Sequence, residues 1–378
     1  MGADYIMEFT DNQKDALKYV QKWHHEYATS RKPTKQVFYI AGWAGTGKST
    51  LARHFASNID GEIAYGAFTG KAALVMRKNG CEGARTIHSM IYIAEENKKT
   101  GEITWKLNRQ SFLHEVSLIV VDECSMVDEE LAKDLMSFGK PILVLGDPGQ
   151  LPPIKGTGYF TEAEPDVMLT EIHRQARDNP IIHLATMLRN ERMPKIGTYG
   201  ESKITNKVST TNLIDADQVL VGRNATRESF NKKIRKLKGF DPDMPAIGDK
   251  LICLQNNKDL GIFNGSMFDV EQVLHTNAMK SHFLNMRVNS QDEDRYPFLI
   301  RVHKSFFFDD VPEPNWKILK GSVSATWGWA ITVHKSQGSQ WDKTLVMANE
   351  AYCFRDDRWK WIYTAVTRAS EKITLVVN

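Results

Sequence analysis

Residues 42–49 constrain the fold of this chain more than any other stretch, and they read Gly-Trp-Ala-Gly-Thr-Gly-Lys-Ser. They match the pattern G-x-x-x-x-G-K-[ST], whose glycines let backbone N–H groups turn inward around phosphate oxygens. An apolar run at residues 37–41 precedes the pattern as a buried strand would, and a stretch of helical character at residues 49–59 follows it. This is the strand–loop–helix context that the pattern requires, so we expect an α/β domain that binds a nucleoside triphosphate.

The residue types in this loop each suit a triphosphate. Lys48 can reach the β- and γ-phosphates, the hydroxyl of Ser49 can hold Mg²⁺, and the start of the following helix adds partial positive charge. The alternative is a chance match in a glycine-containing turn, which the flanking strand and helix argue against. The expected nucleotide-binding residues of the loop are Gly42, Gly45, Thr46, Gly47, Lys48, Ser49 and Thr50.

The length of 378 residues exceeds one ordinary hydrophobic core and suits two or three domains. A net charge of +3 is too small to indicate a nucleic-acid partner by itself, although a global sum can hide a local basic channel. The 4 cysteines include no C-x-x-C pair, which favours reduced thiols in a cytosolic protein. No apolar run approaches the ~20 residues that span a membrane, and the first residues lack a secretory signal. We therefore expect a cytoplasmic protein without a membrane partner.

The first half of the chain alternates strand-like and helix-like segments. Its apolar runs at residues 37–41, 118–121 and 142–145 each end directly in a polar, charged or glycine-rich cluster. Ligands of parallel α/β sheets bind at the carboxyl ends of the strands, so these clusters predict one shared crevice. A turn signal at residues 97–101, between apolar runs at 91–93 and 103–105, predicts a β-hairpin inserted into this domain.

The second half repeats the α/β pattern, with strands expected at residues 218–221, 344–347 and 373–377 and no second phosphate loop. Short strand-like runs between residues 248 and 322 predict an inserted β-domain. Residues 195–212, rich in Gly, Ser and Thr, predict a surface loop. We expect domain 1 at residues 1–170, with its insertion at about 89–112, and domain 2 at residues 171–378, with its insertion at about 248–322.

Two adjacent carboxyl groups, Asp122 and Glu123, follow the strand expected at residues 118–121. Hydrolysis of ATP needs a carboxylate near Mg²⁺ and a second group that orients or deprotonates the attacking water. Asp122 at the metal and Glu123 at the water would divide these tasks. The alternative is an acidic first turn of a helix, where Asp and Glu are also favourable. The phosphate loop in the same domain favours the catalytic interpretation.

Gln150 lies in the cluster Gly-Asp-Pro-Gly-Gln-Leu-Pro-Pro at residues 146–153, after the third strand. Its amide could sense the presence or loss of the γ-phosphate through hydrogen bonds. The same cluster is a Pro/Gly turn, and the two interpretations are compatible.

Two arginines further along the chain, Arg174 and Arg368, suit the role of arginine fingers. A planar guanidinium stabilises the charge on a γ-phosphate during transfer, and ATP bound between the two halves would bring them to it. From spacing alone, a surface arginine in an exposed ion pair is the commoner case.

Two sets of hydroxyl, ammonium and imidazole groups suggest a polymeric substrate. They comprise Thr69, Lys71, Thr86 and His88 in the first half and Thr332, His334 and Lys335 in the second. Single-stranded nucleic acid is bound by donors that follow its backbone and by flat rings that stack on its bases. Trp327, Trp329 and Trp341 lie nearby in the sequence, although core packing is the commoner role of tryptophan.

The order of these motifs resembles that of a known family. Along the chain come FTDNQ (residues 9–13), GWAGTGKST, TGKAA, ARTIHS, VVDECSMVD, LGDPGQLPPI, EIHRQA, VHKSQG and YTAVTRA. Together they resemble a superfamily-one helicase of the 5′→3′ branch, the RecD-like and phage Dda-like enzymes, over nearly the whole chain. The compact size and the run EIHRQARDNPIIHLATMLRN are most similar to the Dda type.

The resemblance implies an α/β fold of two RecA-like P-loop NTPase domains, called 1A and 2A, with ATP in the cleft between them. It also implies a hairpin "pin" (1B) inserted in the first domain and an SH3-like β insertion (2B) in the second. These match the two insertions expected above.

The resemblance also assigns roles to residues. Gln13 would contact adenine, Lys48 and Ser49 the phosphates and Mg²⁺, Asp122 the metal, and Glu123 the water. Gln150 would couple the γ-phosphate to DNA, while Arg174 and Arg368 would be the fingers. The single strand would be faced by Thr69, Lys71, Thr86, His88, Thr332, His334 and Lys335, and Trp105 or Ile103 would form an apolar tip of the pin.

The function that follows is an ATP-dependent DNA helicase that moves 5′→3′ on single-stranded DNA and unwinds duplex, as used in replication, repair or recombination. Its cofactors would be ATP and Mg²⁺, and its partners single-stranded DNA and junctions of single- and double-stranded DNA. We expect a monomer in a bacterial or phage-infected cytoplasm, with a single-strand-binding or replisome protein as a further partner.

Three alternatives remain at this point. A P-loop kinase would need a compact acceptor pocket and a lid, where this chain has a second α/β half. A nucleic-acid-binding module with an inactive nucleotide site conflicts with the full set of catalytic residue types. A motor that translocates without useful unwinding fits the motifs as well as a helicase does, and a preference for RNA over DNA is equally open.

Overall fold

The structure is a computed structural model that describes residues 9–30, 35–96, 103–152, 158–172, 178–242, 244–257, 260–274, 282–292, 295–308, 311–312 and 314–377. The chain divides into two compact units. The first comprises Met1–Phe68 and Val75–His183, and the second comprises Thr69–Leu74 and Leu184–Asn378.

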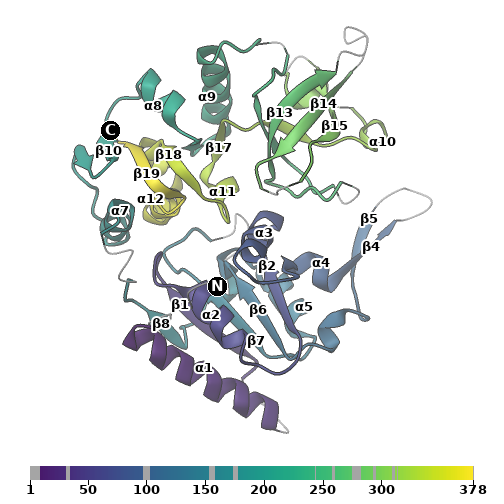
Figure 1. Cartoon of the computed structure of the whole chain (residues 1–378), viewed down its shortest axis with the longest axis vertical. Helices are drawn as coiled ribbons and strands as arrows, with labels where there is room; N and C mark the ends of the chain where they lie inside the picture. The colour runs from purple at the N-terminus through teal and green to yellow at the C-terminus, as the bar shows by residue number, and fades with distance from the viewer. Residues whose placement is uncertain are drawn as a thin grey trace, which may run out of the picture. The chain divides into compact units, whose positions relative to one another are not determined.

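The first unit is built on a six-stranded sheet with the strand order β3-β2-β6-β7-β1-β8 (Figure 1). Its strands are β1 (Val37–Gly42), β2 (Ile63–Ala67), β3 (Arg85–Thr86), β6 (Leu118–Asp122), β7 (Ile142–Gly146) and β8 (Val167–Leu169). All five neighbouring pairs are parallel. The three expected strands are therefore present, and their carboxyl ends meet at one edge of this sheet, as the α/β prediction requires.

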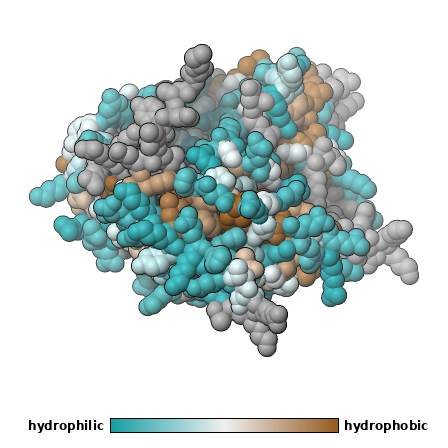
Figure 2. Space-filling view, turned by 60° about the horizontal axis from the view of Figure 1, so that its bottom comes forward, coloured by the Kyte–Doolittle hydropathy of each residue, from teal (hydrophilic) through white to brown (hydrophobic). Residues whose placement is uncertain are grey.

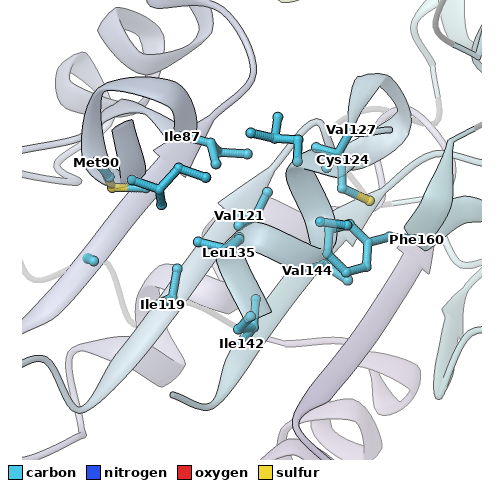
Figure 3. Packing of buried hydrophobic residues seen from close by; sticks show 14 of the residues in the cluster. Ile87, Met90, Ile119, Val121, Cys124, Val127, Leu135, Ile142, Val144 and Phe160 are labelled. Atoms are coloured by element: carbon cyan, nitrogen blue, oxygen red, sulfur yellow. The ribbon is translucent and has the colours of Figure 1, made fainter. Parts of the chain in front are cut away.

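Helices cover both faces of this sheet, because its central strands are apolar on both sides. The helices of this part are α1 (Asp11–Thr29), α2 (Lys48–Ala56), α3 (Gly70–Lys78), α4 (Ile87–Ile91), α5 (Glu129–Met136) and α6 (Tyr159–Glu162), with short 3₁₀ turns at η1 (Phe112–His114) and η2 (Cys124–Met126). On one face, Ile119, Val121 and Val144 pack with residues of α4, α5 and α6 (Figure 3). On the other face, Ile40 and Leu143 pack with residues of α1 and α2.

A hairpin stands at the position expected for the first insertion. It consists of β4 (Tyr92–Glu96) and β5 (Ile103–Leu107), which pair in antiparallel register from Tyr92↔Leu107 to Glu96↔Ile103. The turn signal at residues 97–101 lies outside the described residues. Figure 1 shows the two strands projecting from the helices around them.

The second unit has its own six-stranded sheet, in the order β17-β11-β18-β19-β10-β9. Its strands are β9 (Gly197–Tyr199), β10 (Ser202–Thr205), β11 (Gln218–Val221), β17 (Ala330–Thr332), β18 (Trp341–Val346) and β19 (Ala369–Val376). All neighbours are parallel except the edge pair β9 and β10. The helices of this part are α7 (Pro180–Arg189), α8 (Thr210–Asp215), α9 (Asn224–Leu237), α11 (Val333–Ser336) and α12 (Arg358–Val366), with the 3₁₀ segment η5 (Ala348–Asp357).

The prediction of a surface loop at residues 195–212 is wrong. This stretch contains β9, β10 and the start of α8, and β10 pairs in parallel with β19 through Ile204↔Leu375. Gly200 serves the tight turn between β9 and β10, since its φ of 59° lies in the left-handed region. Composition suggested a loop, but tertiary pairing with the last strand of the chain decided the outcome.

A five-stranded antiparallel sheet interrupts the second unit, in the order β15-β14-β13-β12-β16. Its strands are β12 (Lys250–Cys253), β13 (Met267–Leu274), β14 (Phe283–Ser290), β15 (Phe298–His303) and β16 (Ala325–Trp327), accompanied by η4 (Lys304–Phe306) and α10 (Trp316–Leu319). It has its own apolar core, which includes Leu251, Phe268 and Val302. A separate core is what an inserted small domain needs for stability.

Hydrophilic residues form most of the surface on the face drawn in Figure 2, with hydrophobic residues visible between them. Among the helices in the described part of the chain, none is long and apolar enough to cross a membrane.

Candidate active site

The phosphate-loop segment joins β1 to α2, and two of its glycines carry the backbone that a tight loop needs. Gly45 has a φ of 81° and Gly47 a φ of 77°, both in the left-handed region. A side chain at Gly47 would also collide with Gln13, because an added Cβ would lie 2.7 Å from its Nε2 atom. Glycine at these positions is thus required by geometry.

Gln13 fastens α1 to this loop. Its Nε2 donates to the carbonyl of Thr46 at 2.9 Å, and its Oε1 accepts from the N–H of Thr10 at 3.0 Å. Thr10 in turn accepts from the N–H of Gln13, which completes a capping box at the start of α1. The glutamine expected at adenine therefore lies at the loop, with both ends of its amide engaged by backbone.

Lys48 is the first residue of α2, and its ammonium points back along the loop. Nζ donates to the carbonyls of Gly42 at 2.7 Å and Trp43 at 3.2 Å. Both partners are neutral, so the positive charge is compensated by no carboxylate in these contacts. Phosphate oxygens are better acceptors for an ammonium than carbonyl oxygens, because they are charged.

Ser49 and Asp122, predicted as metal ligands, lie together. The Ser49 hydroxyl donates to Oδ2 of Asp122 at 2.7 Å, and the N–H of Glu123 donates to Oδ1 at 2.8 Å. Burial, and then the charge of Glu123, raise the pKa of Asp122 above its ordinary value. A divalent cation at these oxygens would offset both effects, and a hydroxyl with a single carboxylate is the kind of ligand set Mg²⁺ takes when phosphates complete it.

The residues present therefore fit Mg²⁺ bound together with a nucleotide. Within the described part of the chain, no three His, Cys, Asp or Glu side chains gather into a metal cluster of their own. A metal without a nucleotide would find few protein ligands at Ser49 and Asp122.

Glu123 adopts a backbone conformation that side chains rarely take. Its φ of 53° and ψ of 47° lie in the left-handed region, directly after β6. Such strain at a non-glycine residue costs on the order of 1 kcal/mol and is typical of functional positions. The sharp turn ends β6 and begins the 3₁₀ turn η2.

Gln150 follows β7 and is 7% exposed. Its carbonyl Oε1 is buried without a hydrogen-bond partner among the described residues. A buried acceptor in this state costs stability, so it is suited to accept a hydrogen bond from a ligand or a water. A half-turn of the amide would instead present an N–H donor to a phosphate oxygen.

The first-half candidates for DNA binding hold structural positions in helix starts. Thr69 accepts from the N–H of Ala72 at 3.1 Å, and Thr86 caps α4 by accepting from the N–H of Ser89 at 3.2 Å. Burial lowers the pKa of His88, whose ring lies 5.7 Å from that of Phe68. His88 is therefore mainly neutral near pH 7.

Lys71, which groups with the second unit, forms an ion pair there with Asp292. Nζ and Oδ1 are 3.1 Å apart, and the two side chains are 10% and 6% exposed. A DNA phosphate at Lys71 would have to replace this carboxylate. Trp105, in β5, is 53% exposed and pairs with Ala94 across the hairpin.

The second-half candidates gather where β17 ends. Thr332 ends this strand, and His334 and Lys335 follow in α11. Burial lowers the pKa of His334 and of Lys335, and Arg227 lowers that of Lys335 further. Lys335 Nζ lies 3.5 Å from Oδ1 of Asn264.

Arg368 is buried in the second unit, and neutral oxygens hold its guanidinium. Nε donates to the carbonyl of Thr364 at 3.1 Å, Nη1 to that of Ser339 at 3.3 Å, and Nη2 to the hydroxyl of Thr367 at 3.1 Å. These contacts fix its direction without neutralising its charge. Arg174, the other expected finger, lies outside the described residues.

Two features of the site were not predicted from the sequence, and only one of them has a sequence signal. Thr10 was missed, although the pattern T-x-x-Q at Thr10 and Gln13 is a recognisable capping-box signal. The left-handed backbone at Glu123 has no such signal, because glutamate disfavours this conformation.

A phosphate loop between a parallel strand and a helix, whose serine pairs with an aspartate at the end of another strand of the same sheet, defines the class of P-loop nucleoside triphosphatases. Residues 18–210, just over half of the chain, match the family described as AAA domain, so the chain belongs to this family. Residues 328–376 match the UvrD-like helicase C-terminal domain.

Curated relatives carry names of the same kind. The ATP-dependent RecD2 DNA helicase of Deinococcus radiodurans is 26% identical over 373 residues, which cover 88% of this chain and 46% of that protein. The ATP-dependent DNA helicase Pif1 of Psychrobacter sp. is 24% identical, over 85% of this chain and 63% of that protein. The chain thus spans about half to two thirds of the length of these relatives.

Solved structures share the fold. A structure of Pif1 helicases at forked duplex DNA has a TM-score of 0.61 at 19% identity and covers 97% of this chain and 92% of that one. Bacteroides Pif1 bound to single-stranded DNA has a TM-score of 0.59 at 17% identity, with the same coverage. Together with the domain matches, these similarities confirm the predicted α/β class with parallel sheets, consistent with two RecA-like domains, and the resemblance to superfamily-one helicases of the 5′→3′ branch.

Proposed function

We propose that this chain is an ATP-dependent DNA helicase that moves 5′→3′ on single-stranded DNA and unwinds duplex. The observation that carries the proposal is the pairing of Ser49 with Asp122 beside Lys48, because it joins the phosphate loop to the carboxylate that ATP hydrolysis needs. The match of residues 328–376 to a helicase C-terminal domain supports a motor over a kinase. The names of the relatives, ATP-dependent DNA helicases RecD2 and Pif1, support DNA as the track.

The proposed chemistry is phosphoryl transfer to water. Lys48 and the N–H groups at the start of α2 bind the phosphates, and Ser49 and Asp122 would hold Mg²⁺, which neutralises phosphate charge when bound. Glu123 orients or deprotonates the attacking water, and Gln150 exchanges a hydrogen bond with that water or with the γ-phosphate. Gln13 is proposed at adenine, and the phosphate loop as a whole at the triphosphate.

Arg368 is a proposed arginine finger, because its guanidinium is held rigidly by oxygens that leave its charge free for an anion. Arg174 has the same proposed role from the motif resemblance. The single strand would be bound by Thr69, Lys71, Thr86, His88, Thr332, His334 and Lys335, and Trp105 is a candidate for the apolar tip of the pin.

We also propose the domain names implied by the resemblance. These are 1A at residues 1–170 with the pin 1B at about 89–112, and 2A at residues 171–378 with the SH3-like 2B at about 248–322. The antiparallel hairpin β4–β5 and the separate core of the five-stranded sheet support these assignments. A monomer in the cytoplasm, with a single-strand-binding or replisome protein as a further partner, completes the proposal.

ATP turnover with and without single-stranded DNA tests this function. We expect DNA to stimulate ATP turnover. Lys48→Ala should abolish turnover but leave part of the DNA binding, because the proposed partner of this ammonium is the triphosphate of ATP and not DNA. Glu129→Ala, which removes an exposed carboxyl from α5, is the control and should behave as the wild type. ATP turnover that single-stranded DNA does not stimulate would favour a phosphotransferase instead. Full ATPase activity of Lys48→Ala would reject the assignment of residues 42–49 as a phosphate loop.

A further inference from the structure

Three segments of the second unit meet at one edge of its parallel sheet. The strands β17, β11 and β18 are neighbours in parallel register, so their carboxyl ends share this edge. β17 leads to Thr332, β11 leads through Gly222 and Arg223 into α9, and β18 leads into η5. The functional proposal uses the first of these segments, and the other two have no role in it.

A buried carboxylate joins the two remaining segments. Glu350, in η5, is 3% exposed and accepts from the backbone N–H groups of Gly222 at 2.6 Å and Arg223 at 3.3 Å. It also accepts from Arg223 Nε at 3.0 Å and Nη2 at 2.9 Å, and from the hydroxyl of Thr226. Negative charge at the start of α9 is favourable, and the two side-chain N–H donors that meet at Oε1 of Glu350 fix the arginine. The turn before α9 and the segment η5 therefore form one rigid corner.

Aromatic packing fixes the same corner beside the second-half DNA candidates. The Phe354 ring stacks on buried Trp361, with ring centres 5.3 Å apart and an angle of 15° between the planes. The centres of the His334 and Phe354 rings lie 5.5 Å apart. The next residue, Arg355, has a φ of 45°, a left-handed value that a side chain adopts only where the surroundings hold it. The exposed part of η5 is thus built to a defined shape.

Two side chains reach solvent from this corner. Tyr352 is 64% exposed, and the side chain of Arg223 is 55% exposed although Glu350 holds its guanidinium. Glu350, and to a smaller extent Tyr352, raise the pKa of Arg223, so the two side chains lie within electrostatic reach. Arg227, one turn further along α9, lies within reach of Lys335 and also pairs with Glu228 at 2.9 Å.

We propose that Arg223 and Tyr352 bind one nucleotide of the single strand next to Thr332, His334 and Lys335. This inference rests on the proposed function. The Arg223 guanidinium contacts a backbone phosphate with the N–H groups that Glu350 leaves free, and the Tyr352 ring stacks on a base. An exposed aromatic ring and a fixed guanidinium, on segments that meet hydroxyl and ammonium groups at one sheet edge, are the combination that binds single strands without reading their sequence.

Binding of a fluorescent oligothymidylate, measured by anisotropy at fixed salt, tests the ring. Tyr352→Ala should weaken binding roughly tenfold, because one base loses its stacking partner, and Tyr352→Phe should stay within about twofold of the wild type. Tyr296→Ala is the matched control, since Tyr296 is 94% exposed in the antiparallel insert, and it should bind as the wild type does. Far-UV circular dichroism and the thermal midpoint establish that each variant is folded.

The salt dependence of the same binding tests the arginine. Arg223→Gln should reduce the slope of log Kd against log salt by about 0.7, which is the value of one phosphate contact on a single strand. Lys236→Gln removes the same charge from the far end of α9 and should leave the slope unchanged.

The outcomes separate this inference from the function on which it rests. A wild type that fails to bind the oligonucleotide contradicts both. A wild type that binds, with Tyr352→Ala equally tight or Arg223→Gln equal in slope, overturns the inference alone. Loss of affinity in Tyr352→Phe as large as in Tyr352→Ala also overturns it, because stacking does not need the hydroxyl.

Discussion

Asp122 combines a catalytic position with an unfavourable environment for its charge. Two donors hold its carboxylate, the Ser49 hydroxyl and the Glu123 N–H, yet burial and the neighbouring Glu123 charge raise its pKa above the ordinary value of 3.8. The folded protein therefore binds a proton at Asp122 more tightly than the unfolded chain does. The contribution of this proton to the stability of the folded state is complete below the ordinary pKa of Asp122, and it is lost as the pH rises through the raised pKa of the folded state.

Asp122→Asn should separate stability from activity. We expect a higher thermal midpoint than the wild type at pH 7 without nucleotide, because the amide carries no charge, its oxygen still accepts from the Glu123 N–H, and its NH₂ group can donate to the Ser49 hydroxyl oxygen. The difference should shrink as the pH is lowered towards the ordinary pKa, because the wild-type carboxyl takes up a proton. ATP turnover should fall by about tenfold to a hundredfold, because the proposed site would lose the one charged side chain that we assign to Mg²⁺. Equal midpoints over this pH range would contradict the environment we assign to this carboxyl.

At the residue scale, the sequence predicted a contact between residues of two recognisable motifs and missed a contact between residues outside any motif. Ser49 and Asp122 meet because parallel strands β1 and β6 of one sheet end at the same edge, which the strand-end clusters already indicated. Glu350 and Arg223 are separated by 127 positions, and neither lies in a recognisable motif. Only the fold brings them together.

At the element scale, a buried ion pair attaches the antiparallel insert to the parallel sheet. Arg235, in α9, is bidentate to Asp249, with Nε 3.1 Å from each carboxylate oxygen, and its Nη2 lies 3.0 Å from Oδ2. The two side chains are 4% and 0% exposed. The guanidinium also lies over the Trp327 ring at 3.6 Å, and the Trp329 indole donates to Asp249 at 3.0 Å. Helix α9, the entry strand β12 and the exit strand β16 are thereby joined.

Asp249→Ala should destabilise the protein by roughly 3–5 kcal/mol, because it leaves a buried guanidinium without its counter-charge. Chemical denaturation followed by tryptophan fluorescence measures this change. Asp15→Ala, which breaks the exposed pair of Lys18 and Asp15 on α1, is the control and should cost less than about 1 kcal/mol. Equal losses in the two variants would contradict a structural role for the buried pair.

Periodicity and turn signals predicted three strands of each parallel sheet, namely β1, β6 and β7 in the first and β11, β18 and β19 in the second, because buried apolar runs leave a clear pattern. They failed at residues 197–205, where the edge strand β9 and its neighbour β10 are only a few residues long. β10 owes its structure to pairing with β19, far along the chain, and β9 pairs with β10; composition shows neither pairing.

At the scale of the whole molecule, the function we propose is that of a motor with a direction. The net charge of +3 gives little general attraction for DNA, so the proposed binding would rest on local groups, and we propose those around Thr332, His334 and Lys335. A motor that follows the backbone through such groups reads strand polarity, and this distinguishes it from a passive DNA-binding protein.

Unwinding of duplex DNA that carries a single-stranded tail on one end tests this central claim most directly. Two substrates of identical duplex sequence, one with only a 5′ tail and one with only a 3′ tail, are followed by strand displacement with ATP, and a reaction without ATP is the control. The account predicts displacement from the 5′-tailed substrate alone and only with ATP. Displacement from the 3′-tailed substrate, or from either substrate without ATP, would contradict it.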